Sequence, residues 1–237
     1  MTDTIPVITL DGPAASGKGT IAARVAEALG FHYLDSGALY RIATLDALSK
    51  GIDLDDAGAL TDAAQKLAPV FDGGRILLNG RDVTTAIRAE DVSAATSRVA
   101  VVPGVREALF ALQKHAARLP GLVADGRDMG TVVFPDAQLK VFMTATAKVR
   151  AERRYRQLLG RGETADLEAL TADLEERDRR DSQRATAPLK PAPDAHRLDT
   201  SDMSIEEVVK KVLEWWDETK KSVSYTHLRA HETLRHL

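Results

Sequence analysis

The chain has 237 residues, which is enough for one sizeable hydrophobic core, alone or with small insertions. Its formal net charge of -3, from 32 basic and 35 acidic side chains, argues against broad electrostatic binding to nucleic acid polymers or anionic membranes. The chain has no cysteine, which excludes disulfides and thiolate chemistry. It shows no secretory signal and no membrane-length apolar run, so we expect a cytoplasmic protein.

A glycine-rich loop follows the first predicted strand, residues 6–10, and precedes a predicted helix over 21–29. In such a loop, small residues let backbone N–H groups converge on an anion, a lysine reaches the outer phosphates, and the helix adds its positive dipole end. The spacing predicts a nucleoside triphosphate site formed by Gly12, Pro13, Ala14, Ala15, Ser16, Gly17, Lys18, Gly19 and Thr20. The general motif has Ser or Thr directly after the lysine; Gly19 stands there, so a hydroxyl ligand for Mg²⁺ would come from Thr20.

A second strand over 31–34 completes a strand-helix-strand unit and predicts a parallel sheet. A turn and a second helix, over 38–48, follow it. Because ligands bind beyond the carboxyl ends of parallel strands, we expect Ser36, Tyr40 and Arg41 to face the same crevice as the loop.

A small antiparallel meander is predicted after a weaker helix over 57–67. Its runs, 70–72, 75–78 and 81–83, are separated by Gly73-Gly74 and Asn79-Gly80. Parallel architectures seldom contain such a meander, so we interpret residues 59–95 as an insertion. It is either a surface excursion or a wall that helps to enclose a substrate, and we favour the wall.

Two further helices are predicted over 92–101 and 105–118, divided by Pro103-Gly104. The apolar run that follows ends in Asp125. After a phosphate-binding loop, a carboxylate at the end of a strand suggests a ligand of Mg²⁺. The alternative is a structural role for Asp125 as a helix cap or turn residue.

An arginine-rich helix is predicted from residue 145, after a strand over 139–143. It carries Arg150, Arg153, Arg154 and Arg156. Taken alone, these arginines indicate a solvated helix face. Beside a triphosphate site, however, a mobile helical lid over about 148–165 would serve to exclude water from the transferring phosphoryl group, and we favour this lid.

The helix predicted over 165–184 has an apolar stripe that becomes charged. Leu167, Leu170 and Leu174 recur by steps of three and four, and the same steps lead to three charged residues, Arg177, Asp181 and Arg184. The stripe either emerges into solvent or enters a polar cleft. We favour the cleft, because leaving buried charges unpaired is costly and Pro188 leaves little exposed helix.

The C-terminal part is predicted to contain a strand over 196–199 and a helix over 205–221 that begins with a capping box of Ser204 and Glu207. Its apolar face belongs to the core. Residues 224–237 hold three of the six histidines without the spacing of a paired metal site. We interpret them as a non-native or disordered tail without a functional role.

The residues near the loop narrow the reaction class. The only asparagine, Asn79, is followed by glycine, so the guanine-reading motif of GTPases is absent from the sequence. A kinase for a sugar or shikimate hydroxyl needs a carboxylate as base, and Asp35 or Asp128 could serve. Converging guanidinium groups instead suit an acceptor that is itself an anion; these would come from Arg41, Arg127 and Arg184. A phosphate acceptor is already deprotonated and needs no base, so catalysis would rest on Lys18, Mg²⁺ and the arginines.

Several motifs together resemble the bacterial cytidylate kinase family over residues 5–220. They are Ile8-Thr9-Leu10-Asp11-Gly12-Pro13, Gly17-Lys18-Gly19-Thr20, Leu34-Asp35-Ser36-Gly37-Ala38-Leu39-Tyr40-Arg41, Ala124-Asp125-Gly126-Arg127-Asp128-Met129-Gly130-Thr131-Val132-Val133-Phe134-Pro135, Glu176-Arg177-Asp178 and Arg184-Ala185-Thr186-Ala187-Pro188-Leu189. The resemblance implies a three-layer α/β P-loop fold with a parallel sheet. Its core would comprise 1–58 and 96–223, with the lid included and 59–95 as the antiparallel insertion on the monophosphate side.

The resemblance also implies residue roles. Residues Gly12 to Thr20 would bind the ATP phosphates, and Arg41, Arg127 and Arg184 the acceptor phosphate. The remaining acceptor contacts would be Ser36, Ser97, Arg106 and Asp128 at the cytosine edge, with Arg177 and Asp181 near the sugar. Arg153, Arg154 and Arg156 are the lid candidates. The loop sequence Ala14-Ala15-Ser16 departs from the family's commoner Ser-Gly-Ala, and we expect Ala15 to avoid a positive φ angle.

The implied activity is transfer of the γ-phosphoryl group of ATP, with Mg²⁺, to CMP and also to dCMP. The expected partners are these nucleotides, without nucleic acid polymer or membrane, and the expected state is a monomer. The alternatives are a P-loop kinase for another small acceptor, such as UMP, AMP or shikimate, and a nucleotide-sensing module that transfers nothing.

Overall fold

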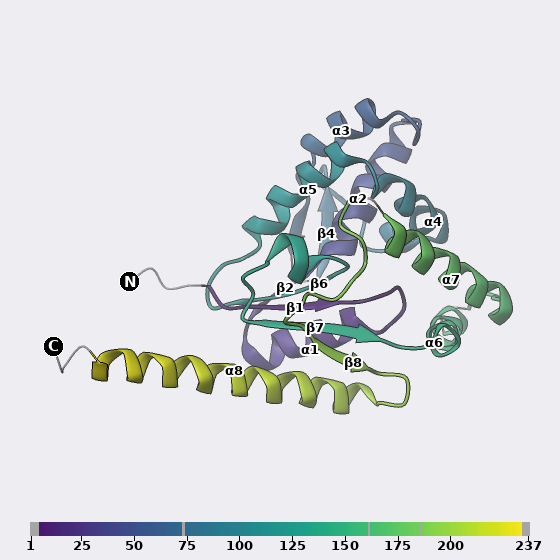
Figure 1. Ribbon diagram of the computed structural model, residues 1–237. Helices are drawn as coiled ribbons and strands as arrows, with labels where there is room; N and C mark the ends of the chain where they lie inside the picture. Colours follow the sequence, from purple (N-terminus) through teal and green to yellow (C-terminus); the bar gives the residue numbers. More distant parts are fainter. Residues whose placement is uncertain (1–4, 73, 161, 185, 234–237) are drawn as a thin grey trace.

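Two β-sheets organise the part of the chain that the computed structural model describes, which is residues 5–72, 74–160, 162–184 and 186–233. Within these residues, the parallel sheet has five strands in the order β2 (His32–Asp35), β6 (Leu122–Gly126), β1 (Val7–Asp11), β7 (Leu139–Thr144) and β8 (His196–Asp199). The second sheet is antiparallel and contains β3 (Val70–Asp72), β4 (Arg75–Leu78) and β5 (Arg81–Asp82). The predicted α/β fold is therefore confirmed (Figure 1).

Helices cover both faces of the parallel sheet because neighbouring residues of a strand point to opposite faces. Val7 and Ala124 belong to one core, which contains residues of α2 (Ser36–Ser49), α3 (Ala57–Gln65) and α5 (Pro103–His115). Ile8 and Val123 belong to the other, with residues of α1 (Lys18–Leu29) and α8 (Ile205–Thr233). In Figure 1, α1 and α8 accordingly lie below the sheet and α2, α3 and α5 above it.

Five further helical segments complete the described part of the chain. They are η1 (Ala86–Arg88), α4 (Glu90–Val99), the π-helical turn η2 (Met129–Val133), α6 (Ala147–Leu159) and α7 (Leu167–Gln183). Side-chain hydrogen bonds join α4 to both α6 and α7, and Figure 1 shows the three helices on the same side of the molecule. No helix among the described residues is long and apolar enough to cross a membrane.

The carboxyl ends of β1, β2 and β6 meet at one edge of the sheet. Asp11 of β1 is in register with Gly126 of β6, and Asp35 of β2 is in register with Asp125 of β6. The segments that leave these strands are the glycine-rich loop, the first turn of α2 and the turn that carries Arg127. The parallel register therefore brings together three segments that lie far apart in the sequence.

Two helix boundaries differ from the sequence prediction. Pro103 is the first residue of α5 instead of a separator between helices, because a proline at the first helical position leaves no hydrogen bond unmade. Helix α8 continues to Thr233, so the prediction that it ends near Lys221 is wrong. Residues 222–233 contain neither glycine nor proline, the residues that commonly end helices. Residues 234–237 of the predicted tail and Gly73 of the predicted turn lie outside the described residues.

Candidate active site

The glycine-rich loop is shaped by close approaches that only glycine permits. A Cβ atom at Gly12 would lie 2.2 Å from the carbonyl oxygen of Met143 on β7, so no side chain fits there. Gly17 has a φ of 86° directly before α1, in the left-handed region that favours glycine. Ala15 has a φ of 56°, so the expectation that it avoids a positive angle is wrong. The loop holds this alanine in the strained conformation because its neighbours on both sides are fixed by the core and by α1.

Lys18, the first residue of α1, lies buried at the base of this loop. Its Nζ donates a hydrogen bond of 3.0 Å to the carbonyl oxygen of Pro13. Burial, followed by the positive charge of Arg127, lowers the pKa of Lys18 to about 7, although Asp125 and Asp35 oppose this shift. An anion bound in the loop would favour the charged form, so the site is prepared for a phosphate group.

Asp125 lies inside β6 and is buried beside the start of α1. Its Oδ2 accepts a hydrogen bond of 2.6 Å from the hydroxyl group of Tyr33. Burial, followed by the negative charge of Asp35, raises the pKa of Asp125 to about 6. The carboxylate lies so close to Gly19 that a Cβ atom there would be 3.2 Å from Oδ2. Asp125 caps no described helix, which removes the helix-cap alternative.

This carboxylate fits one kind of metal site. Across the described part of the chain, no cluster of three or more His, Cys, Asp or Glu residues could hold an ion alone. Mg²⁺ often binds to one or two protein ligands and completes its coordination with water and substrate phosphates. Asp125 and the exposed Thr20, on the first turns of α1, provide such a partial donor set next to the loop.

A second cluster of charges lies where the turn after β6 meets α7. The Nε of Arg127 donates a hydrogen bond of 2.9 Å to Oδ2 of Asp181. Burial opposes ionisation of Asp181, but the neighbouring arginines, Arg127 first, outweigh it and hold the pKa of Asp181 below its usual value. Burial, followed by Arg127, lowers the pKa of Arg177 to about 10. The charged continuation of the α7 stripe is therefore partly buried among other charges instead of emerging into solvent.

The other predicted acceptor residues surround this cluster. Arg41 forms an ion pair with Asp35 at 2.8 Å, and Arg106 forms one with Asp128. Arg184 donates a hydrogen bond of 2.8 Å to the carbonyl oxygen of Ala187. Lys18 and Arg184 both interact electrostatically with Arg127. The structure therefore brings Arg41, Arg127 and Arg184 into one charged network with Lys18.

Three of these arginines have a buried donor left over. The Nε atoms of Arg41, Arg177 and Arg184 are buried and have no hydrogen-bond partner among the described residues. A buried N–H group without a partner is costly, and a charged one more so. A guanidinium group binds anions through charge-assisted hydrogen bonds, so this cluster has the chemistry of an anion site.

The two predicted serines have different surroundings. Ser36 is buried at the start of α2 and its hydroxyl group donates 2.9 Å to Oε1 of Gln113. Ser97 on α4 donates 3.0 Å to the carbonyl oxygen of Ala94 and accepts 3.1 Å from Nη1 of Arg180. Neither Arg180 nor Gln113 was predicted to have a role. The position of Arg180 three residues after Arg177 was the available signal, whereas nothing local marks Gln113.

The four arginines of α6 contact different partners. Arg150 is buried, donates 3.0 Å to the carbonyl oxygen of Ala14 in the loop, and forms an ion pair with Asp178 of α7. Arg153 donates 3.3 Å to the carbonyl oxygen of Ser16. Arg154 instead reaches Glu90 of α4 at 2.7 Å, and Arg156 is largely exposed, 3.5 Å from Glu152.

A cavity of about 400 Å³ lies where α6 faces the loop. Its walls include residues of the loop, three arginines of α6 and the start of α8, among them Ser16, Thr20, Arg153, Arg154, Arg156 and Ile205. It therefore opens beside the second half of the loop and the first turn of α1.

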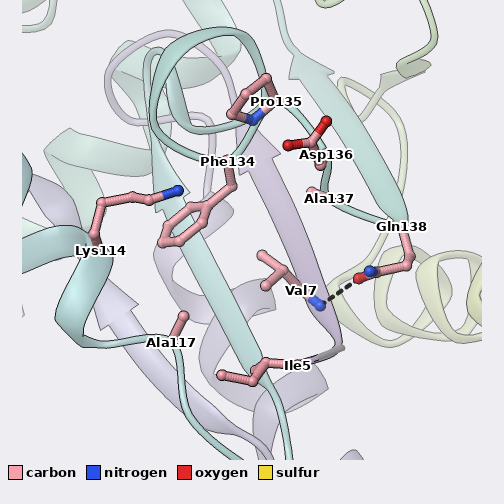
Figure 2. Close-up of a pocket in the computed structure, with 9 residues that line it drawn as sticks. All are labelled: Ile5, Val7, Lys114, Ala117, Phe134, Pro135, Asp136, Ala137 and Gln138. Carbon is pink, nitrogen blue, oxygen red and sulfur yellow. Dashed lines mark hydrogen bonds between the residues drawn. The ribbon is translucent and has the colours of Figure 1, made fainter. Parts of the chain in front are cut away.

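A smaller cavity, of about 190 Å³, lies at the opposite end of β1 (Figure 2). The backbone N–H of Val7 donates 2.7 Å to Oε1 of Gln138 there, and the ammonium group of Lys114 lies 5.1 Å from the ring centre of Phe134. The loop follows the other end of the same strand, so this cavity is separate from the candidate site.

Comparison with known proteins agrees with this geometry. The family model described as cytidylate kinase matches residues 8–218. A cytidylate kinase of Cupriavidus pinatubonensis is 53% identical over 218 residues, covering 92% of this chain and 99% of the relative. One of Chromobacterium violaceum is 52% identical over 219 residues, again covering 92% and 99%. A solved gluconokinase from Sinorhizobium meliloti shares the fold alone, with a TM-score of 0.51 and 15% identity over 93% of this chain and 97% of that one. The chain belongs to the cytidylate kinase family.

Proposed function

We propose that this protein transfers the γ-phosphoryl group of ATP to CMP, giving ADP and CDP, and that it also accepts dCMP. The observation that carries the proposal is the set of buried, unpartnered Nε atoms of Arg41, Arg177 and Arg184 in a charged network with Lys18. Such donors suit a phosphate acceptor better than a neutral hydroxyl group, because a guanidinium group binds an anion with charge-assisted hydrogen bonds.

On the donor side, residues Gly12 to Thr20 would bind the phosphates of ATP and the 400 Å³ cavity would take its nucleoside. The donors facing the phosphates would be the loop N–H groups, Lys18 and the lid arginines, of which Arg153 already touches the loop. Thr20 and Asp125 would hold Mg²⁺, which neutralises phosphate charge when bound.

On the acceptor side, Arg41, Arg127 and Arg184 would bind the phosphate of CMP. The remaining contacts would divide between the base, with Ser36, Ser97, Arg106 and Asp128, and the sugar, with Arg177 and Asp181. Asp128 and Arg106 already pair with each other and so offer one acceptor and several donors in a fixed arrangement.

Transfer would need positioning more than proton chemistry. A phosphate monoester oxygen is deprotonated at neutral pH, so no general base has to remove a proton. The protein has to hold two phosphate groups in line against their mutual repulsion, which Lys18 and the arginines would screen. Arg127 would contribute most, since its charge reaches both Lys18 and Arg177.

The test is an assay for ADP release with CMP, dCMP, UMP, AMP and shikimate as acceptors. We expect the highest kcat/KM with CMP. Preference for another acceptor would replace the proposed substrate, and release of almost no ADP with any of them would indicate a sensing module.

The same assay tests the arginine assignment with Arg127→Ala. We expect kcat with CMP to fall by roughly 10²- to 10³-fold, the loss typical for removing one donor that stabilises transition-state charge. ATP affinity, measured by calorimetry, should change little. Normal CMP turnover in this variant would contradict the proposed role.

A further inference from the structure

Arg180 is a charged residue of α7 that has no role in the proposal above. It follows Arg177 by three residues, so these two side chains lie along the same side of α7. Arg179 lies on a different side and pairs with Glu176 at 2.7 Å. Arg180 therefore shares the side of α7 that carries Arg177, and half of its side chain is exposed.

The guanidinium group of Arg180 reaches across to α4. Its Nη1 donates a hydrogen bond of 3.1 Å to the hydroxyl oxygen of Ser97, while its Nε lies 3.6 Å from Oε1 of Glu176. Glu176 thereby contacts the Nε side of the guanidinium group, while Nη1 remains for Ser97. A second link, from Arg154 to Glu90 at 2.7 Å, holds the start of the same helix, α4, against α6.

These contacts use up most of the hydrogen-bonding capacity of Ser97. A hydroxyl group has one proton to donate and two lone pairs that accept. The proton is donated to the carbonyl oxygen of Ala94, at 3.0 Å, and Arg180 occupies one lone pair. Donation from a charged group polarises the hydroxyl group and strengthens its own donation to Ala94. What remains for a ligand is one lone pair, which takes an N–H or O–H group.

We propose that Arg180 is a positioning residue that fixes Ser97 as a hydrogen-bond acceptor and thereby favours a base with an amino group over one with a carbonyl group at the same position. Cytosine offers an amino group where uracil offers a carbonyl oxygen, so Arg180 would contribute to the choice of CMP over UMP. This inference rests on the proposed function, in which Ser97 faces the base.

The experiment compares Arg180→Ala with Arg179→Ala, a matched control on the same helix. For each protein, kcat/KM is measured with CMP and with UMP, and their ratio gives the CMP preference. The dissociation constants of both nucleotides are also measured by calorimetry, so that the preference can be calculated even if UMP is turned over too slowly to assay. We expect the CMP preference to fall roughly threefold to tenfold in Arg180→Ala, the range for one hydrogen bond. It should stay at the wild-type value in Arg179→Ala, since that side chain touches only its own helix.

Two further variants separate positioning from general charge. If Arg180 acts through Ser97, adding Arg180→Ala to Ser97→Ala changes the CMP preference no further, and Arg180→Lys restores part of it. An unchanged preference in Arg180→Ala, or an additive loss in the double variant, would overturn the inference. Wild-type protein that turns over neither CMP nor UMP would instead overturn the proposed function itself, so the two failures are distinguishable.

Discussion

Ala15 shows how far a single residue of the loop departs from its preferred conformation. Its φ of 56° is in the left-handed region, which costs a residue with a Cβ atom about 1–2 kcal/mol. The small side chain of Ala15 fits the expected loop, but its positive φ angle was not predicted. The angle follows from tertiary contacts, namely the packing of Ala14 with Ala151 and Leu174 and the hydrogen bond from Arg150 to the Ala14 carbonyl oxygen.

Ala15→Gly should therefore stabilise the protein. Relief of the left-handed strain exceeds the extra chain entropy of glycine, so we expect a gain of about 0.5–1 kcal/mol in the free energy of unfolding. Urea denaturation of the nucleotide-free protein measures it. Ala14→Gly is the control, and it should destabilise because Ala14 is buried and has no positive φ to relieve. The same sign for both variants would argue against backbone strain at Ala15.

Asp11 is a buried acid that the sequence showed only as part of a motif. Its two oxygens accept hydrogen bonds of 2.8 Å from the backbone N–H groups of Met129 and Gly130, which ties the start of the loop to the turn after Arg127. Burial raises the pKa of Asp11 to about 6 despite these hydrogen bonds. Local sequence cannot reveal such a contact, because its partners lie more than a hundred residues away.

The raised pKa makes a prediction about stability and pH. A folded-state pKa above the unfolded value of 3.8 means that the contribution of Asp11 is fully present below about pH 4 and is lost as the pH rises through about 6. Asp11→Asn does not titrate. We expect the stability of the wild type relative to this variant to fall by about 3 kcal/mol over that interval and then to level off. Denaturation curves at several pH values give the difference; two parallel pH profiles would refute the assignment.

At the scale of elements, α7 was the most predictable from the sequence. Its spacing of leucines and charges predicted Leu174 in a core, which is confirmed, and Arg177 and Asp181 out of full solvent, where the structure partly buries them. The partners of α6 were not predictable in the same way. A row of arginines looks alike in sequence, whereas the structure buries Arg150 and exposes Arg156.

Arg150 should act as the structural link among the loop, α6 and α7. Arg150→Met would leave the Asp178 carboxylate and the Ala14 carbonyl oxygen without their donor, and we expect the free energy of unfolding to drop by about 3 kcal/mol. Arg156→Met in the same helix removes only an exposed pair and should change stability by less than about 0.5 kcal/mol. Chemical denaturation compares them, and equal effects would mean that Arg150 is no such link.

At the scale of the whole molecule, the strand-loop-helix unit and the tight turns were enough to predict a parallel sheet with an antiparallel addition. The division of the chain into a core, an insertion over 59–95 and a lid stays a prediction, as does a monomeric state. The links from α4 to α6 and α7 could not be predicted, because they depend on which surfaces meet in three dimensions.

Removal of residues 224–237 should leave catalysis intact. Among the side chains of α8 that the structure describes, Val208, Val212 and Trp216 are buried in the core, and they precede this segment. The cavity beside the glycine-rich loop is lined by the first residues of α8, at the opposite end of that helix. We expect the shortened protein to keep the kcat and KM values of the full chain in the ADP-release assay. A large loss of turnover would show that the segment takes part in function.

The central place of β1 has a consequence for synthesis on the ribosome. This strand is translated before the other strands of its sheet, yet its two neighbours are β6, which begins at Leu122, and β7, which begins at Leu139. Both edges of an apolar strand therefore wait, unpaired, while the intervening segments emerge. The nascent chain therefore has to keep β1 from pairing with other molecules until β6 and β7 have emerged from the exit tunnel.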